Sequence, residues 1–152
     1  MPKILSSDHP RQCLLFFVAQ DINDELRQKV KAFVQRISKA REWVIKPPRF
    51  VDSAVEADRP EVDLPVVTLG GLLELYSAYP GTNLPKDVDR QHLEEVEFLV
   101  KELQTFSQEN ALAVEFELDQ TFVGSIEDGI LDRSLREGLL GAWRKHLETK
   151  KE

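Results

Sequence analysis

Apolar and polar residues alternate along residues 112–126, and this pattern predicts an extended strand. The even positions are mostly apolar and include Phe122, whereas Glu115, Glu117 and Asp119 occupy odd positions. Successive side chains of a strand point to opposite faces, so we expect one buried apolar face and one acidic face. A tight turn in the middle of this segment would lack the usual glycine or asparagine. We therefore expect one long, bent strand.

Three segments have the spacing of helices. Residues 22–39 and residues 87–110 repeat apolar side chains every three or four positions, which is typical of helices that bury one face. Asp21 is placed to cap the first of them. Ser134 and Glu137 have the spacing of a capping box at the start of a third helix near the C-terminus.

The remaining segments are shorter. Residues 13–20 form a continuous apolar run, which favours a buried strand. Residues 41–55 contain two apolar stretches divided by a pair of prolines, so we expect an edge strand or two short strands there. Residues 56–65 have the composition of a loop. Residues 68–79 have helical spacing weakened by two glycines, and we expect a short helix that ends before Pro80.

Taken in order, these elements predict an α+β fold, with a small antiparallel or mixed sheet and helices packed mainly on one face. Such an arrangement covers the apolar side of every amphipathic element. We expect a flexible N-terminal tail over residues 1–12, a single α+β domain over residues 13–148, and a frayed C-terminus over residues 149–152.

Charge changes this picture because it is unevenly distributed. The chain has a net charge of −7, with 41% hydrophobic and 31% charged residues. Residues 51–130 contain four Lys or Arg and eighteen Asp or Glu, whereas residues 1–50 contain ten and five. An acidic surface repels phosphate backbones, so we expect no nucleic-acid partner. A basic protein is the natural partner for such a surface.

The sequence contains no recognisable catalytic motif. The three histidines His9, His92 and His146 lack metal-ligand spacing, and Cys13 begins an apolar strand without an activating neighbour in the sequence. We expect no catalytic residues, no bound metal and no cofactor. No segment is long and apolar enough to span a membrane, and the N-terminus does not resemble a signal peptide, so we expect a cytoplasmic protein without a membrane partner.

These observations favour a protein-binding module, comparable to small acidic inhibitors or immunity proteins, rather than an enzyme. The candidate binding residues are the acids of the alternating strand and two tyrosines that could anchor an interface. They are Glu115, Glu117, Asp119, Tyr76 and Tyr79. A metal-dependent enzyme or metal-binding protein that uses the strand carboxylates is the first alternative. A structural homo-oligomer, in the simplest case a symmetric homodimer formed by apolar strand edges and two glycines of the last helix, is the second.

Overall fold

The computed structural model describes residues 11–19, 22–52, 68–76 and 84–149. The described elements are strands and helices in mixed order, and the final helix begins with π-helical turns. In chain order they are β1 (Arg11–Val18), α1 (Asp24–Ala40), β2 (Arg49–Asp52), β3 (Leu69–Tyr76), α2 (Lys86–Asn110), β4 (Ala113–Leu118), β5 (Thr121–Glu127), β6 (Ile130–Leu131), η1 (Ser134–Gly141) and α3 (Ala142–Thr149).

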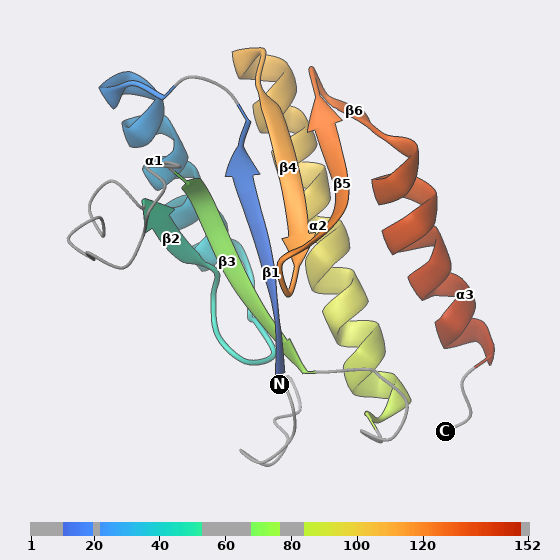
Figure 1. Ribbon diagram of the computed structural model, residues 1–152. Helices are drawn as coiled ribbons and strands as arrows, with labels where there is room; N and C mark the ends of the chain where they lie inside the picture. The colour runs from blue at the N-terminus through green and yellow to red at the C-terminus, as the bar shows by residue number, and fades with distance from the viewer. Residues whose placement is uncertain (1–10, 20–21, 53–67, 77–83, 150–152) are drawn as a thin grey trace.

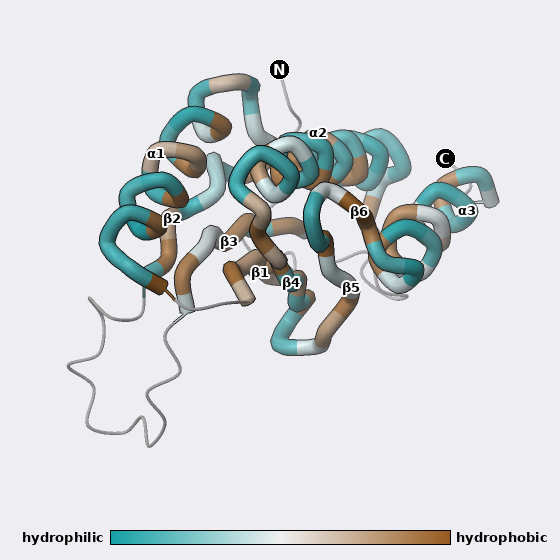
Figure 2. Tube along the Cα trace, turned by 90° about the horizontal axis from the view of Figure 1, so that it is seen from above, coloured by the Kyte–Doolittle hydropathy of each residue, from teal (hydrophilic) through white to brown (hydrophobic). Residues whose placement is uncertain are grey.

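The six strands form one antiparallel sheet in the order β2-β3-β1-β4-β5-β6. Figure 1 shows α1 and α2 behind this sheet and α3 beyond β5 at its side, and Figure 2 shows α1 and α2 lying along the same side of the sheet. The expected α+β fold with helices on one face is therefore confirmed. We call the opposite side of the sheet the open face, because no described helix covers it.

The core lies between the sheet and the helices. Even-numbered side chains of β1 and β4 point into it, and the rings of Phe16 and Phe116 lie 6.5 Å apart between their centroids. From α1, Phe33 meets Phe16 edge-on at 6.3 Å and stacks on Phe106 of α2 at 4.7 Å. These aromatic contacts tie both long helices to the centre of the sheet.

The expected short helix over residues 68–79 is wrong, because residues 69–76 form β3, which lies between the edge strand β2 and β1. The paired glycines explain the difference. A Cβ atom at Gly70 would lie 1.8 Å from the backbone oxygen of Phe16, and one at Gly71 would lie 2.5 Å from the tip of the Phe16 ring. The glycines therefore allow β3 to pack closely against β1 and its ring.

The expected single strand over residues 112–126 is also wrong. Residues 113–118 and 121–127 form two strands of a hairpin. Its turn consists of Asp119 and Gln120, whose φ angles of 49° and 72° match a type I′ turn. The register also shifts by one residue between Phe116 and Glu117, so Val123 of β5 forms a bulge. The segment is extended as expected, but the chain reverses within it.

Several boundaries also differ from expectation. β1 begins at Arg11, inside the expected tail, and β2 lies at the sheet edge but includes only the end of the expected segment 41–55. The cap of α1 is Asn23, whose Oδ1 accepts a hydrogen bond from the backbone N–H of Leu26 at 2.8 Å. Asp21, the expected cap, lies outside the described residues, as do residues 1–10, the loop 56–65 and residues 150–152.

The last helical segment is capped by Asp132 rather than by Ser134. Oδ1 of Asp132 accepts a hydrogen bond from the N–H of Leu135 at 2.8 Å, and Glu137 pairs instead with Arg133. The expected capping box is therefore wrong. Leu135 packs under Gly124 of β5, where a Cβ atom would lie 2.4 Å from that of Leu135, so η1 covers the inner side of the hairpin.

Candidate functional site

Two rows of side chains cross the open face from strand to strand. Directly paired residues of neighbouring strands share a face, so the register defines each row. The first row contains Leu72, Leu15, Glu117 and Phe122, from β3, β1, β4 and β5. The second row contains Gly70, Phe17, Glu115 and Ser125, from the same four strands. The open face therefore mixes apolar side chains with carboxylates.

The large exposed hydrophobic side chains are found on this face. Among the described residues, Phe122 at 51% and Ile130 at 72% are the large hydrophobic residues that the fold leaves exposed. Phe122 pairs with Glu117, and Ile130 pairs with Glu127 on the same side of the sheet. Leu15, Phe17 and Leu72 add half-buried apolar area. Apolar area concentrated on one side in this way is typical of an interaction surface.

Sequence reasoning placed Phe122 on the core side and treated the run over residues 13–20 as wholly buried, and both expectations are wrong. The bulge at Val123 turns Phe122 outward, and the odd-numbered residues of β1 are only half-buried. The sequence did contain an indication. A strand with apolar side chains on both faces needs a packing partner on each face, and the described helices pack against one face of the sheet.

The two acids of β4 face outward as expected, and they have no counter-ion in the described part of the chain. The side chains of Glu115 and Glu117 are half-buried, point to the open face, and make no hydrogen bond or ion pair with another described residue. They lie about 6.6–6.8 Å apart along the strand, from the rise per residue. In the described part of the structure, two half-buried negative charges therefore lie beside apolar side chains without a neutralising partner.

Asp119 has a different role from the one expected. It lies in the turn of the hairpin, where its Oδ1 accepts a hydrogen bond from the N–H of Cys13 at 2.9 Å. Its own N–H donates to the carbonyl oxygen of Cys13, also at 2.9 Å. Asp119 therefore fastens the hairpin to β1, and it does not continue the row formed by Glu115 and Glu117.

A third outward-facing carboxylate, Glu74 of β3, is already neutralised. It lies 2.6 Å from Nζ of Lys46 and 3.6 Å from Nη1 of Arg11. The close contact with Lys46 lowers the pKa of Glu74 from its ordinary value, with help from the charge of Arg11 and against the effect of burial. Next to it, Cys13 has a raised pKa, because of burial first and then the charges of Glu74 and Asp119, so its thiol is a poor nucleophile.

The two tyrosines cannot be assigned to this face. Tyr76 is only 2% exposed and packs edge-on against the ring of His92, so its expected role as a surface anchor is wrong. Arg11, its direct partner on β1, lies 5.7 Å from the centre of the ring, so the Tyr76 ring is in contact with Arg11 as well as His92. Tyr79 lies outside the described residues.

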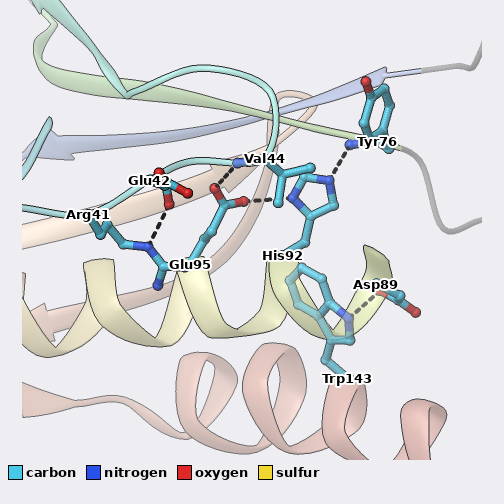
Figure 3. Close-up of polar contacts among 8 residues, drawn as sticks. All are labelled: Arg41, Glu42, Val44, Tyr76, Asp89, His92, Glu95 and Trp143. Carbon is cyan, nitrogen blue, oxygen red and sulfur yellow. Dashed lines mark hydrogen bonds and ion pairs between the residues drawn. The ribbon is translucent and has the colours of Figure 1, made fainter. Parts of the chain in front are cut away.

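A second polar cluster lies inside the molecule, where α2 meets the sheet (Figure 3). His92 and Glu95 are both 0% exposed, and Nδ1 of His92 lies 2.8 Å from Oε1 of Glu95. The other carboxylate oxygen accepts a hydrogen bond from the N–H of Val44 at 2.7 Å, and Nε2 of His92 accepts one from the N–H of Tyr76 at 3.0 Å. The pair therefore joins three parts of the chain.

Asp89, one turn earlier on α2, is also fully buried and accepts a hydrogen bond from Nε1 of Trp143 at 2.7 Å (Figure 3). Histidine beside glutamate is a common catalytic combination. Here, however, both side chains of the pair are enclosed and the partners are backbone N–H groups. The cluster satisfies buried donors and holds α2, β3 and α3 together, which is a structural role.

Among the residues that the structure describes, no three acidic, histidine or cysteine side chains come close enough to hold a metal ion. Within the described ranges, Glu115 and Glu117 have no third acidic, histidine or cysteine side chain beside them. None of the described helices has the length and apolar character required to cross a bilayer.

Comparison of the chain with protein-family models, with curated proteins and with solved structures finds no match. The function must therefore be inferred from the chemistry of the open face.

Proposed function

We propose that this chain is a protein-binding module whose open sheet face docks a basic partner protein. The observation that carries the proposal is the coincidence, on one face, of the exposed Phe122 and Ile130 and several half-buried apolar side chains with two carboxylates that lack a counter-ion among the described residues. By occupying a basic surface of its partner, such a module would act as an inhibitor- or immunity-like protein, by analogy with other small acidic proteins.

The apolar component would supply most of the affinity. Leu15, Phe17, Leu72 and Phe122 surround the middle of the face, and buried aromatic anchors commonly dominate the energy of an interface. Removing Phe122 from water would be favourable because about half of its side chain is exposed in the isolated chain.

The charged component would supply specificity and a higher association rate. Glu115 and Glu117 project from β4 between the apolar side chains of β1 and β5. The chain as a whole has a net charge of −7, so it would attract a basic surface over a distance and raise the association rate. Once docked, the carboxylates would reject partners that do not present positive charges at matching positions.

This charge also argues against any homodimer in which two copies meet through the open face. Two copies meeting face to face would bring the carboxylates of Glu115 and Glu117 together, and like charges at an interface are unfavourable. The other proposed dimer contact, the glycines of the last helix, gains no support either. A Cβ atom at Gly138 would meet no atom within 4 Å, and Gly141 approaches only its own segment at Arg136.

The proposal is tested by affinity capture with the full chain from a lysate of its native host, followed by measurement of binding to the captured protein by calorimetry. We expect the double variant Glu115→Lys/Glu117→Lys to weaken binding by about tenfold or more, because each change places like charges together. Asp119 is left intact because its side chain holds the hairpin to β1.

The matched control is Glu94→Lys/Glu109→Lys, which changes net charge by the same amount at exposed positions of α2. We expect this control to retain the partner, with at most a modest loss of association rate. If both double variants bind as the unmodified chain does, or if both lose the partner equally, the open face is not the docking surface.

A further inference from the structure

Each of the two carboxylates without a counter-ion has a phenyl ring as its direct cross-strand neighbour on the open face. Glu115 of β4 pairs with Phe17 of β1, and Glu117 pairs with Phe122 of β5. The Cβ atoms of directly paired residues lie about 4.5–5.5 Å apart. The open face therefore presents two adjacent pairs, each with one carboxylate and one ring, on opposite sides of β4.

This combination suits one side chain better than any other. An arginine guanidinium is planar, so it can form two parallel hydrogen bonds with a carboxylate while its flat face stacks on an aromatic ring. A lysine ammonium is a compact and strongly hydrated point charge, which can pair with the carboxylate but gains less from the ring. A carboxylate beside a phenyl ring thus distinguishes arginine from lysine.

Nearby cations of the described chain do not fill these positions. Arg11 and Lys46 are engaged with Glu74. Arg49 shares a row with Glu117, but Leu72 and Leu15 lie between them, so the two residues are three strand spacings or about 14 Å apart. Among the described residues, therefore, no cation pairs with Glu115 or Glu117, and we look to another molecule for their positive charges.

We infer that the partner of the open face inserts two arginine side chains, one at the Glu115–Phe17 pair and one at the Glu117–Phe122 pair. This inference rests on the proposed binding function and specifies its chemistry. The two sites are about 6.6–6.8 Å apart along β4, which matches alternate residues of an extended strand. Residues four apart on a helix, about 6.0 Å along its axis, fit the same spacing.

The test uses two synthetic peptides as probes, identical except at two positions. One peptide has the sequence Thr-Arg-Val-Arg-Thr, and the other has lysine in place of each arginine. Each is titrated into the isotopically labelled full chain, and binding is followed by NMR. We expect the arginine peptide to bind about fivefold more tightly or better, since stacking of a guanidinium contributes at both sites. The shifts should concentrate at the residues of the two pairs.

Two variants locate the effect. Glu115→Gln/Glu117→Gln should abolish the shifts caused by either peptide, because it removes both charges with little change in shape. Phe122→Leu should reduce the preference for arginine over lysine while leaving binding of the lysine peptide nearly unchanged. Because Phe122 is half exposed, this variant should fold normally, and the NMR spectrum of the free protein checks this directly.

Equal affinity for the two peptides would overturn the arginine inference but would leave a basic partner in place. Absence of binding by either peptide, or binding that survives Glu115→Gln/Glu117→Gln, would also overturn it. The capture experiment with charge-reversed variants remains a separate test of the binding function, so the two failures can be told apart.

Discussion

Nδ1 of His92 lies 2.8 Å from Oε1 of Glu95 in the closed interior of the protein. Because Nε2 of the same ring accepts a hydrogen bond from the N–H of Tyr76, the proton of the neutral imidazole must be on Nδ1. Glu95 thus accepts two hydrogen bonds, one from His92 and one from the N–H of Val44. The carboxylate is the acceptor on which two buried donors depend.

Replacing Glu95 with leucine should therefore destabilise the fold strongly. The substitution leaves the N–H of Val44 and Nδ1–H of His92 buried without an acceptor, and each such group costs about 1–3 kcal/mol. We expect the free energy of unfolding in urea to fall by about 2–5 kcal/mol, with faster hydrogen exchange at the Val44 amide. Glu94→Leu, at the exposed neighbouring position, should change stability little. Equal losses in the two variants would refute the proposed role of Glu95.

The contact between Trp143 and Asp89 should hold α3 against α2. Trp143→Phe keeps the ring but removes the N–H that donates to the buried carboxylate at 2.7 Å, a contact worth about 1.5–3 kcal/mol. We expect a loss of stability in that range and faster hydrogen exchange within α3. In an Asp89→Ala background, which offers no side-chain acceptor to Nε1, the same substitution should cost less, because the two residues interact directly. Simple additivity of the two substitutions would show that this hydrogen bond contributes little.

The hairpin turn should be open to stabilisation. Gln120 has a φ angle of 72°, which disfavours residues with a Cβ atom, whereas glycine adopts such angles freely. We expect Gln120→Gly to raise the free energy of unfolding by about 0.5–1 kcal/mol, measured by urea denaturation. As a control, Gln35→Gly in the exposed part of α1 should lower stability by about 1 kcal/mol. A destabilised Gln120→Gly variant would contradict the type I′ turn.

Glu74 should make stability depend on pH in the acid range. Its folded-state pKa is lowered, chiefly by Lys46, so its unfolded state binds a proton more readily than its folded state. The contribution of Glu74 is therefore present above its ordinary pKa of 4.5 and is lost as pH falls through the lower folded-state value. We expect Lys46→Met to flatten the acid limb of a stability profile measured by chemical denaturation. An unchanged acid limb would mean that Lys46 does not set this pKa.

The helices could be predicted from sequence because each one repeats apolar residues every three or four positions, and this spacing can be read from a short stretch of the chain. In α1, Leu26, Val30 and Ile37 repeat at helical spacing and are all buried. The strand β3 could not be predicted in this way, because Leu69, Leu73 and Tyr76 also fit a helical repeat. What decides the conformation of β3 is the close approach of Phe16 to the two glycines, which is a contact between distant parts of the chain.

The hairpin was missed for a different physical reason. Next to a two-residue turn, odd residues face even ones, as Glu117 faces Phe122. The bulge at Val123 then adds one residue to β5, and Phe116 faces Gly124 beyond it. The added residue restores the original parity, so the apolar alternation looks continuous although the chain reverses direction. The positions of Glu115 and Glu117 were predictable, whereas the outward position of Phe122 depends on the bulge.

The buried polar cluster could be predicted only in part. His92 and Glu95 lie three positions apart on one helix, so their contact is visible in the sequence as a spacing. Their other partners, Tyr76 and Val44, are 16 and 51 residues away from the side chains that they contact, and only the fold brings them together.

The most direct test of the open face as a docking surface is site-specific photo-crosslinking. Phe122 is replaced by the photoreactive residue p-benzoylphenylalanine, and the full chain is irradiated in its native host. As a control, the same residue replaces Gln35 on the exposed side of α1. We expect a crosslinked partner from position 122 that disappears when Glu115→Lys/Glu117→Lys is added, and none from position 35. Crosslinking of the same partner from position 35 alone, or no crosslink from position 122, would contradict the account.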